Sequence, residues 1–266
     1  DDCSSRGLGD VYKRQKDSDQ QKLWEMVSDK RVRYVHFAPP CGTFSRARER
    51  PLSKELLEKG VKEPKPLRTD SQPLGIDDLK RSDKIRVDLA NKLVKLVGDL
   101  CKSIHANGKF FTIENPWRSI MWLTEDMKTI ANLSGVFDVK VDMCMFGSKR
   151  FKSTKLLTNM QAMKDMGVTC DHKHQHVPYG VQDGKFATAE EAEYTKEFCD
   201  AMARCVHKQL NMTAAQSMLA EHTWRDFAYK TTTYQRPSGS GPALEWITSR
   251  TTEVWMDDQS AWTTIN

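Results

Sequence analysis

The stretch that decides the fold is residues 83–113, DKIRVDLANKLVKLVGDLCKSIHANGKFFTI. Its first part places apolar side chains at three- and four-residue steps, the pattern of one helix face: Ile85, Leu89, Leu93, Leu96, Leu100 and Ile104. Asn107-Gly108 is a helix stop signal. The apolar runs 109–113 and 32–37 predict strands on either side of this helix. Strand, long helix and strand form a crossover with parallel strands, so we predict an α/β fold.

Composition places the chain among soluble proteins of the cell interior. The 266 residues are 38% apolar, which is enough for a core, and no stretch approaches the roughly 20 apolar residues of a membrane helix. The seven cysteines are odd in number and contain no CxxC pair, which favours a reducing, intracellular compartment, nuclear if the source is eukaryotic. The net charge of +5 permits a nucleic-acid partner without requiring one.

Three parts of the chain differ in character. Residues 1–15 resemble a translated adaptor sequence, and we exclude them from the fold. Residues 16–212 form the predicted domain, in which the polar, proline-rich stretch 45–83 reads as a functional insertion. Residues 213–266 read as a tail or linker of unknown role. Further predicted elements are helices at 20–29, 53–58, 124–133 and 188–210, and strands at 136–143 and 153–158 that pair antiparallel at a sheet edge.

Two motifs follow the two predicted parallel strands. Pro39-Pro40-Cys41-Gly42-Thr43-Phe44-Ser45 comes after the first strand, and Glu114-Asn115-Pro116 after the second. Because the carboxyl ends of parallel strands meet at one edge of a sheet, both motifs should share a catalytic edge. A thiolate at Cys41 would be the nucleophile, and the carboxyl group of Glu114 would be an acid or base.

These motifs resemble the nucleophile and proton-donor motifs of DNA cytosine-5 methyltransferases. In that family the cysteine adds to carbon 6 of a flipped cytosine, the glutamate bonds nitrogen 3, and carbon 5 takes a methyl group from S-adenosylmethionine. The resemblance makes Cys41 the nucleophile and Glu114 its proton partner, with Asn115 and Pro116 shaping the glutamate loop. The chain departs from the family at Gly42, where a glutamine is usual.

The resemblance covers residues 16–212 and is closest to a divergent branch that we associate with mobile elements. It implies a Rossmann-like methyltransferase fold that is incomplete at its amino end, because the glycine-rich loop for the methyl donor would lie upstream of Asp17. The implied protein is a monomer that acts on DNA, and a fragment of this kind can be inactive. S-adenosylmethionine would contact Asp17, Pro39 and Pro40. The implied DNA-binding residues are Ser45, Arg46, Arg48, Lys149, Arg150, Lys152 and Lys155.

Two other functions remain open. A methyltransferase acting on an exocyclic nitrogen also carries two prolines after a strand, but it needs no thiol at position 41. A non-catalytic nucleic-acid-binding remnant of a mobile element would use the basic residues alone.

Several residues have a chemical and a structural interpretation. Cys170, His172, His174 and His176, with Cys144, are zinc-ligand types, but alternate residues of an extended chain spread too far apart to share an ion. We therefore predict a polar loop and no metal. We expect His36 to be an interior histidine. Trp117 and Trp122 flank the glutamate motif, where core packing is the simpler expectation than base stacking.

Overall fold

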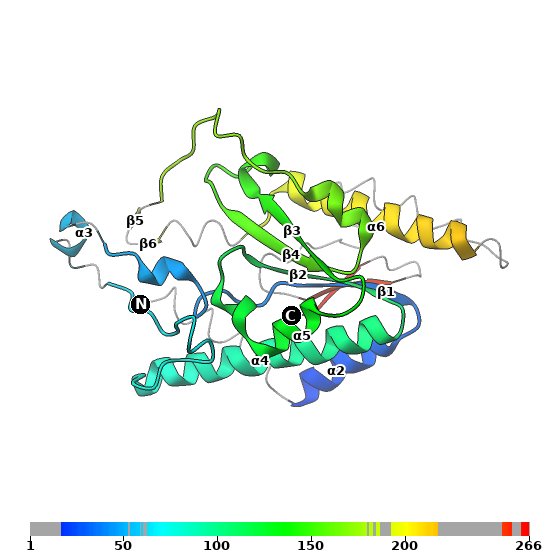
Figure 1. Ribbon diagram of the computed structural model, residues 1–266, viewed down its shortest axis with the longest axis horizontal. Coiled ribbons are helices and arrows are strands. Elements are labelled where there is room, and N and C mark those ends of the chain that lie inside the picture. Colours follow the sequence, from blue (N-terminus) through cyan, green and yellow to red (C-terminus); the bar gives the residue numbers. More distant parts are fainter. Residues whose placement is uncertain are drawn as a thin grey trace, which may run out of the picture.

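The computed structural model describes residues 17–52, 54–58, 60, 63–179, 181–182, 185–186, 193–217, 252–256 and 262–265. They form an α/β fold, as the crossover pattern predicts (Figure 1). The helices are α2 (Asp17–Ser28), α3 (Lys54–Glu58), α4 (Arg81–Ala106), α5 (Glu125–Ala131) and α6 (Lys196–Ser217). The four principal strands are β1 (Val32–Phe37), β2 (Phe110–Pro116), β3 (Phe137–Asp142) and β4 (Ser153–Thr158).

These four strands form a mixed sheet in the order β3-β4-β2-β1. β1 and β2 are parallel, with Tyr34 opposite Phe110 and Phe37 opposite Ile113. β4 is antiparallel to both β2 and β3, so β3 runs in the same direction as β2. The backbones of β7 (Thr252–Met256) and β8 (Trp262–Ile265) continue the sheet in antiparallel fashion beyond β1. A separate two-stranded ribbon pairs β5 (Val181–Gln182) with β6 (Lys185–Phe186).

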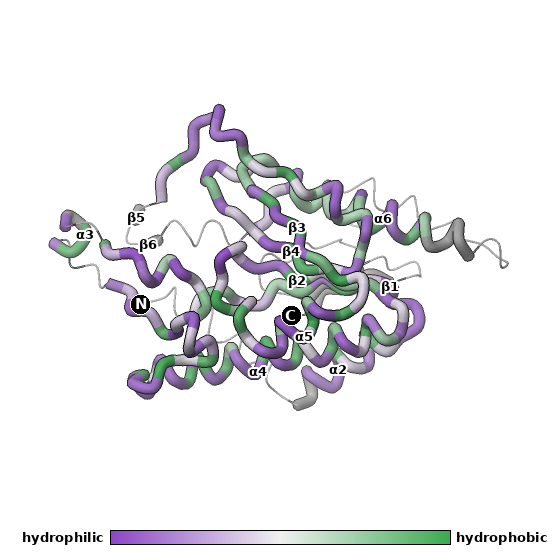
Figure 2. Tube along the Cα trace, viewed as in Figure 1, coloured by the Kyte–Doolittle hydropathy of each residue, from purple (hydrophilic) through white to green (hydrophobic). Residues whose placement is uncertain are grey.

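Helices cover both faces of the sheet. α2, α4 and α5 lie on one face and α6 on the other (Figure 1). Strand side chains alternate between two apolar clusters, so that Val35 and Phe37 belong to the cluster on the α4 side and Tyr34 to the cluster on the α6 side. Apolar and polar residues accordingly alternate along α4 and α6 (Figure 2). Burial on both faces accords with apolar residues that point to either side of β1 and β2.

The long helix follows the predicted stripe except that Leu93 is partly buried and Ile85 is exposed. Leu89, Leu96, Leu100 and Ile104 are buried, whereas Ile85 is 41% exposed. The reason is geometric, because the amino end of α4 extends past the sheet and has no strand beneath it (Figure 1).

The other predicted elements agree in kind and differ in extent. The predicted strand 109–113 continues to Pro116, so the Glu114-Asn115-Pro116 motif ends β2 instead of following it. The predicted strand pair is confirmed as β3 and β4, with β3 at the sheet edge. Helix α6 begins at Lys196, and the start signal at 188–191 lies outside the described residues. Short 3-10 helices precede or follow several elements: η1 (Arg46–Glu49), η2 (Ile120–Leu123), η3 (Met143–Phe146) and η4 (Gln161–Met166).

None of the helices in the described ranges is long and apolar enough to cross a membrane.

The packing of α4 on β1 and β2 should dominate stability. Leu100 is 1% exposed within the cluster on the α4 side. We expect Leu100→Ala to lower the free energy of unfolding by about 2–5 kcal/mol, because it leaves a cavity between helix and sheet. Lys92→Ala, at an exposed position of the same helix, should change it by less than about 0.5 kcal/mol. Urea denaturation of the two variants measures the difference, and equal effects would contradict this packing.

Candidate functional site

The two motifs meet at one edge of the sheet. Phe37 and Ile113 are paired at the carboxyl ends of the parallel strands, so the residues that follow them leave the sheet together. Buried Asn115 makes the direct link, since its Nδ2 donates a hydrogen bond of 2.7 Å to the carbonyl of Pro39. The structure therefore brings the turn of Cys41 beside the strand end that carries Glu114.

The turn that bears Cys41 is closed by main-chain hydrogen bonds. The N–H of Phe44 donates to the carbonyl of Cys41 at 2.8 Å, and the carbonyl of Phe44 accepts from the N–H of Ile120 at 3.0 Å. Phe44 is fully buried, whereas Cys41 is half-buried. A fixed backbone thus presents a thiol that solvent or a ligand can reach.

A buried arginine from the insertion contacts this turn and fixes it in place; we call these contacts the Arg68 clamp. Arg68, 1% exposed, donates from Nε to the carbonyl of Thr43 at 3.2 Å and from Nη2 to Thr43 Oγ1 at 3.0 Å. Its guanidinium lies 3.6 Å from the centre of the Phe44 ring. Further hydrogen bonds go to the carbonyls of Pro73 and Val87 and to Asn91 Oδ1. Burial lowers the pKa of Arg68 to about 10, which leaves it charged at neutral pH.

Sequence reasoning missed Arg68. Its one signal was its place in a stretch, residues 45–83, that is too long for a plain loop.

Glu114 is buried, and one of its two carboxyl oxygens has a hydrogen-bond partner. Its Oε2 accepts a hydrogen bond of 3.2 Å from the hydroxyl of Tyr194, and its Oε1 lies 3.9 Å from Lys152 Nζ in an ion pair. Among the described residues, Oε1 accepts no hydrogen bond although solvent does not reach it. One buried carboxyl oxygen beside the turn of Cys41 is therefore open to a hydrogen bond with a ligand.

His36 is an interior histidine, as predicted, and it contacts the same network. Its Nε2 lies 3.0 Å from the hydroxyl of Tyr194. Because that hydroxyl donates its proton to Glu114, His36 Nε2 must carry a proton and Nδ1 must be unprotonated. Burial lowers the pKa of His36 to about 4, so the ring is neutral at physiological pH. A tyrosine just before α6 thus connects β1 to the carboxylate of β2.

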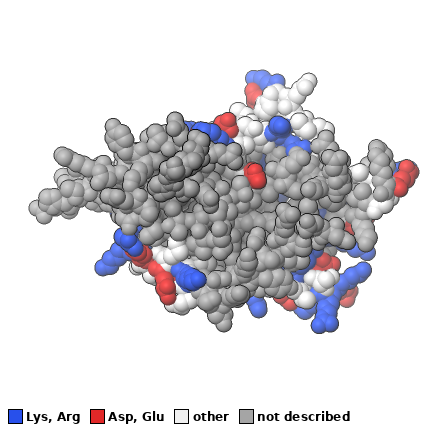
Figure 3. All heavy atoms as spheres, turned by 180° about the vertical axis from the view of Figure 1, so that it is seen from behind, with Lys and Arg blue, Asp and Glu red and all other residues white. Residues whose placement is uncertain are grey.

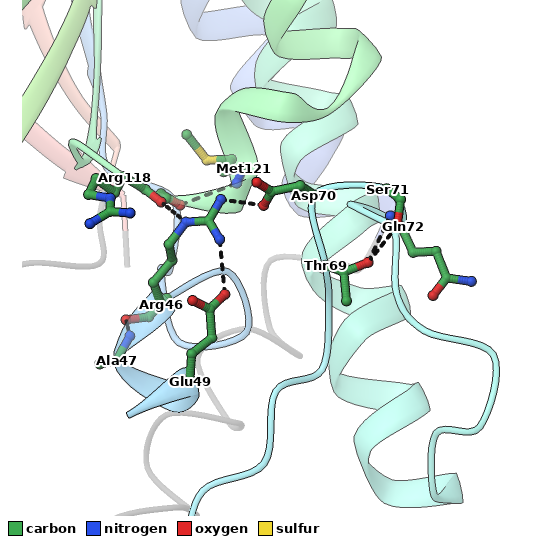
Figure 4. Close-up of polar contacts among 11 residues, drawn as sticks. Arg46, Ala47, Glu49, Thr69, Asp70, Ser71, Gln72, Arg118 and Met121 are labelled. Carbon is green, nitrogen blue, oxygen red and sulfur yellow. Dashed lines mark hydrogen bonds and ion pairs between the residues drawn. The ribbon is translucent and has the colours of Figure 1, made fainter. Parts of the chain in front are cut away.

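The residues expected to bind DNA near Cys41 are used within the protein. Ser45 Oγ accepts from the N–H of Ala47 and caps η1. Arg46 donates to Glu49 at 3.0 Å, to the carbonyl of Arg118 at 3.0 Å and to Asp70 (Figure 4). The hydrogen bond with Asp70 raises the pKa of Arg46.

Arg48 makes a similar internal contact, donating to the carbonyl of Lys65 at 2.9 Å. Arg46 therefore fastens the insertion to the loop after β2, and Arg48 links two parts of the insertion. The role of both as DNA ligands stays a prediction.

The second basic group lies on the turn between β3 and β4 and on β4 itself. Lys149 is exposed, Arg150 is buried and Lys152 lies against Glu114. Lys155 Nζ is bound to Asp138 at 2.6 Å and lies within 5.2 Å of the ring centre of Trp117.

Trp122, whose indole N–H donates to the carbonyl of Pro116, lies 4.9 Å from the same ammonium. On the opposite face of the molecule, described cationic and anionic side chains lie intermingled (Figure 3).

The predicted polar loop at 170–176 has a different geometry from the one expected. The sulfur atoms of Cys144 and Cys170 and the imidazoles of His174 and His176 lie within 4.8 Å of one another. The expectation of ligands spread along an extended chain was wrong because the chain bends at His172, whose φ of 58° is left-handed. His172 itself stays outside this cluster of four.

The residues expected to hold S-adenosylmethionine are only partly described. Asp17 is the first residue of α2, and its side chain lies outside the described part. Pro39 is buried and Pro40 half-buried. The carbonyl of Pro39 is bound by Asn115.

Comparison with known proteins adds no relative. No protein family, no curated protein and no solved structure matches the chain.

The Arg68 clamp can be tested with a substitution that removes the N–H donors of the arginine side chain and keeps a side chain of similar length. Arg68→Met would remove the hydrogen bonds from the guanidinium to the acceptors on Thr43, Pro73, Val87 and Asn91. We expect a loss of about 3 kcal/mol in the free energy of unfolding. Arg50→Met, at an exposed position, is the matched control and should be nearly neutral. A loss below about 1 kcal/mol for Arg68→Met would rule out the clamp.

Burial of neutral His36 makes stability depend on pH. The unfolded chain takes up a proton near pH 6.5, whereas the folded chain does so only near pH 4. The free energy of unfolding should therefore fall as the pH is lowered through this window, by up to about 3 kcal/mol. Denaturation at pH 7, 6 and 5 measures this slope, which His36→Gln should remove. The same change at exposed His172 should leave the slope intact.

Proposed function

We propose that the chain carries the chemistry of a DNA cytosine-5 methyltransferase, with Cys41 as nucleophile and Glu114 as proton partner. The observation that carries the proposal is the hydrogen bond from Asn115 to Pro39, which ties the turn of a half-buried thiol to the strand end of a buried carboxylate. The parallel β1-α4-β2 crossover with both motifs at its carboxyl edge supports a Rossmann-like methyltransferase fold as part of the same proposal.

The two groups suit addition of sulfur to a pyrimidine. The Cys41 thiolate forms a bond to carbon 6 of cytosine, and the electron pair of the 5,6 double bond moves through the ring toward nitrogen 3, which takes a proton held by Glu114. Carbon 5 is then enamine-like and reacts with an electrophile. Loss of the carbon 5 proton to water and cleavage of the carbon–sulfur bond restore the ring double bond and the thiolate, and nitrogen 3 returns its proton to Glu114. Lys152, 3.9 Å from Glu114 Oε1, would balance the carboxylate charge after it gives up its proton.

The buried environment supports the role of Glu114. A carboxyl oxygen without a hydrogen bond among the described residues and screened from water can, when it carries a proton, donate that proton to a ring nitrogen of a flipped base. Tyr194 fixes the other oxygen, so the carboxyl plane is set before a base enters.

S-adenosylmethionine supplies the methyl group when it is bound. Of its expected contacts only Pro39 and Pro40 lie among residues with described side chains, and the addition step at Cys41 needs no cofactor.

An exchange assay tests the addition step directly. Sulfur addition at carbon 6 makes carbon 5 exchange its hydrogen with water, so the chain should release tritium from DNA labelled at carbon 5 of cytosine. We expect Cys41→Ser to reduce this release to background and Glu114→Gln to slow it by about 100-fold or more. Cys199→Ser, at another half-buried cysteine, is the control and should be as active as the unaltered chain.

The alternatives give other outcomes. With S-adenosylmethionine present, covalent trapping on DNA that contains 5-fluorocytosine should occur through Cys41 and through no other cysteine. Methylation that persists in Cys41→Ser would instead indicate transfer to an exocyclic nitrogen. DNA binding that weakens steeply with salt, without exchange or trapping, would indicate a non-catalytic binding module.

A further inference from the structure

We infer that Cys144, Cys170, His174 and His176 form a structural zinc site that fastens residues 170–177 to the turn between β3 and β4. The inference stands on the geometry of these residues and is independent of the proposed methyl transfer.

The distances are those of ligands around one tetrahedral ion. Cys170 Sγ lies 3.5 Å from His176 Nε2 and 3.8 Å from His174 Nε2. Zinc bonds of about 2.3 Å to sulfur and about 2.05 Å to nitrogen place a sulfur and a nitrogen about 3.6 Å apart at a tetrahedral angle. All four ligand atoms, including Cys144 Sγ, lie within 4.8 Å of one another. A small contraction around an ion is all the change the site requires.

The donor set favours zinc and a structural role. Two sulfur and two imidazole ligands in tetrahedral arrangement suit zinc better than magnesium or calcium, which take oxygen. Four protein ligands also leave no open position for a substrate or a water molecule, which is the mark of a structural site.

Neighbouring groups orient the ligands as they do in zinc sites. The N–H of Cys170 donates to Asp142 Oδ2 at 2.8 Å, which fixes this residue against the carboxyl end of β3. The N–H of His172 donates to Cys170 Sγ at 3.3 Å, a contact that stabilises a thiolate. The centre of the Phe151 ring lies 5.6 Å from that of His176, in an edge-to-face contact.

The segment that supplies three of the ligands contributes few apolar side chains to the core. Residues 171–175 are all exposed, and Val177 is 45% exposed, so no apolar core of its own orders this stretch. An ion bound to Cys170, His174 and His176 would provide the missing constraint.

The cluster is connected to Glu114 through the backbone of the turn between β3 and β4. The N–H of Val177 donates to the carbonyl of Lys149 at 2.9 Å, and the N–H of Met143 donates to the carbonyl of Lys152 at 2.9 Å. Because Cys144 lies on η3 within this same turn, an ion at the cluster would fix the backbone that places Lys152 beside Glu114.

Metal analysis of the full chain tests the inference without any activity assay. The chain, purified under reducing conditions without chelator, should contain about one zinc per molecule by elemental mass spectrometry. Replacement by cobalt should give the visible bands of a tetrahedral site with sulfur ligands, and zinc should slow alkylation of Cys144 and Cys170.

Matched variants separate ligands from neighbours. Cys170→Ser and His176→Ala should lose bound zinc. His174→Ala, at an exposed position that folding should tolerate, should weaken zinc binding at least tenfold. His172→Ala and Cys41→Ser should keep a full equivalent. Absence of zinc after reconstitution, or an equal loss in His172→Ala and His174→Ala, would overturn the site.

Discussion

The parallel pairing of β1 and β2 is the constraint on which the rest depends. Parallel strands cannot be joined by a tight turn, so α4 must cross the sheet and bury one face of it. The register that sets Phe37 opposite Ile113 also sets Asn115 within reach of the Pro39 carbonyl. A slip of two residues would move these groups apart by about 6.6 Å, so strand register and the geometry of the reactive edge are specified together.

The interior next to that edge is polar, and its groups depend on one another. Glu114, Tyr194 and His36 are linked in series from β2, through the segment just before α6, to β1. In a low-dielectric interior such a series is favourable only while each member keeps its partner. The docking of α6 on the sheet therefore also decides how the carboxyl group is oriented.

The architecture could be read from the sequence because it rests on local patterns. The stripe from Leu89 to Ile104 and the apolar runs of β1 and β2 predict the crossover directly. The carboxyl ends of the two strands then give the position of both motifs. Groups recruited by tertiary structure could not be read in this way. Arg68 reaches the site from a segment with no periodic pattern. Tyr194 lies in the predicted helix 188–210, but it precedes α6, and its pattern gave no sign of the bond to Glu114. The Cys170–His176 cluster depends on one left-handed residue, His172.

The guanidinium of Arg68 beneath Phe44 changes how the long segment between β1 and α4 should be regarded. Surface insertions usually vary freely in length, because they touch the scaffold only at their ends. Here a residue from the middle of the segment supports the floor of the reactive turn. Transplanting that turn onto another scaffold would therefore require its distant arginine as well. Shortening the segment would displace Arg68 and, through the turn it supports, the sulfur atom of Cys41.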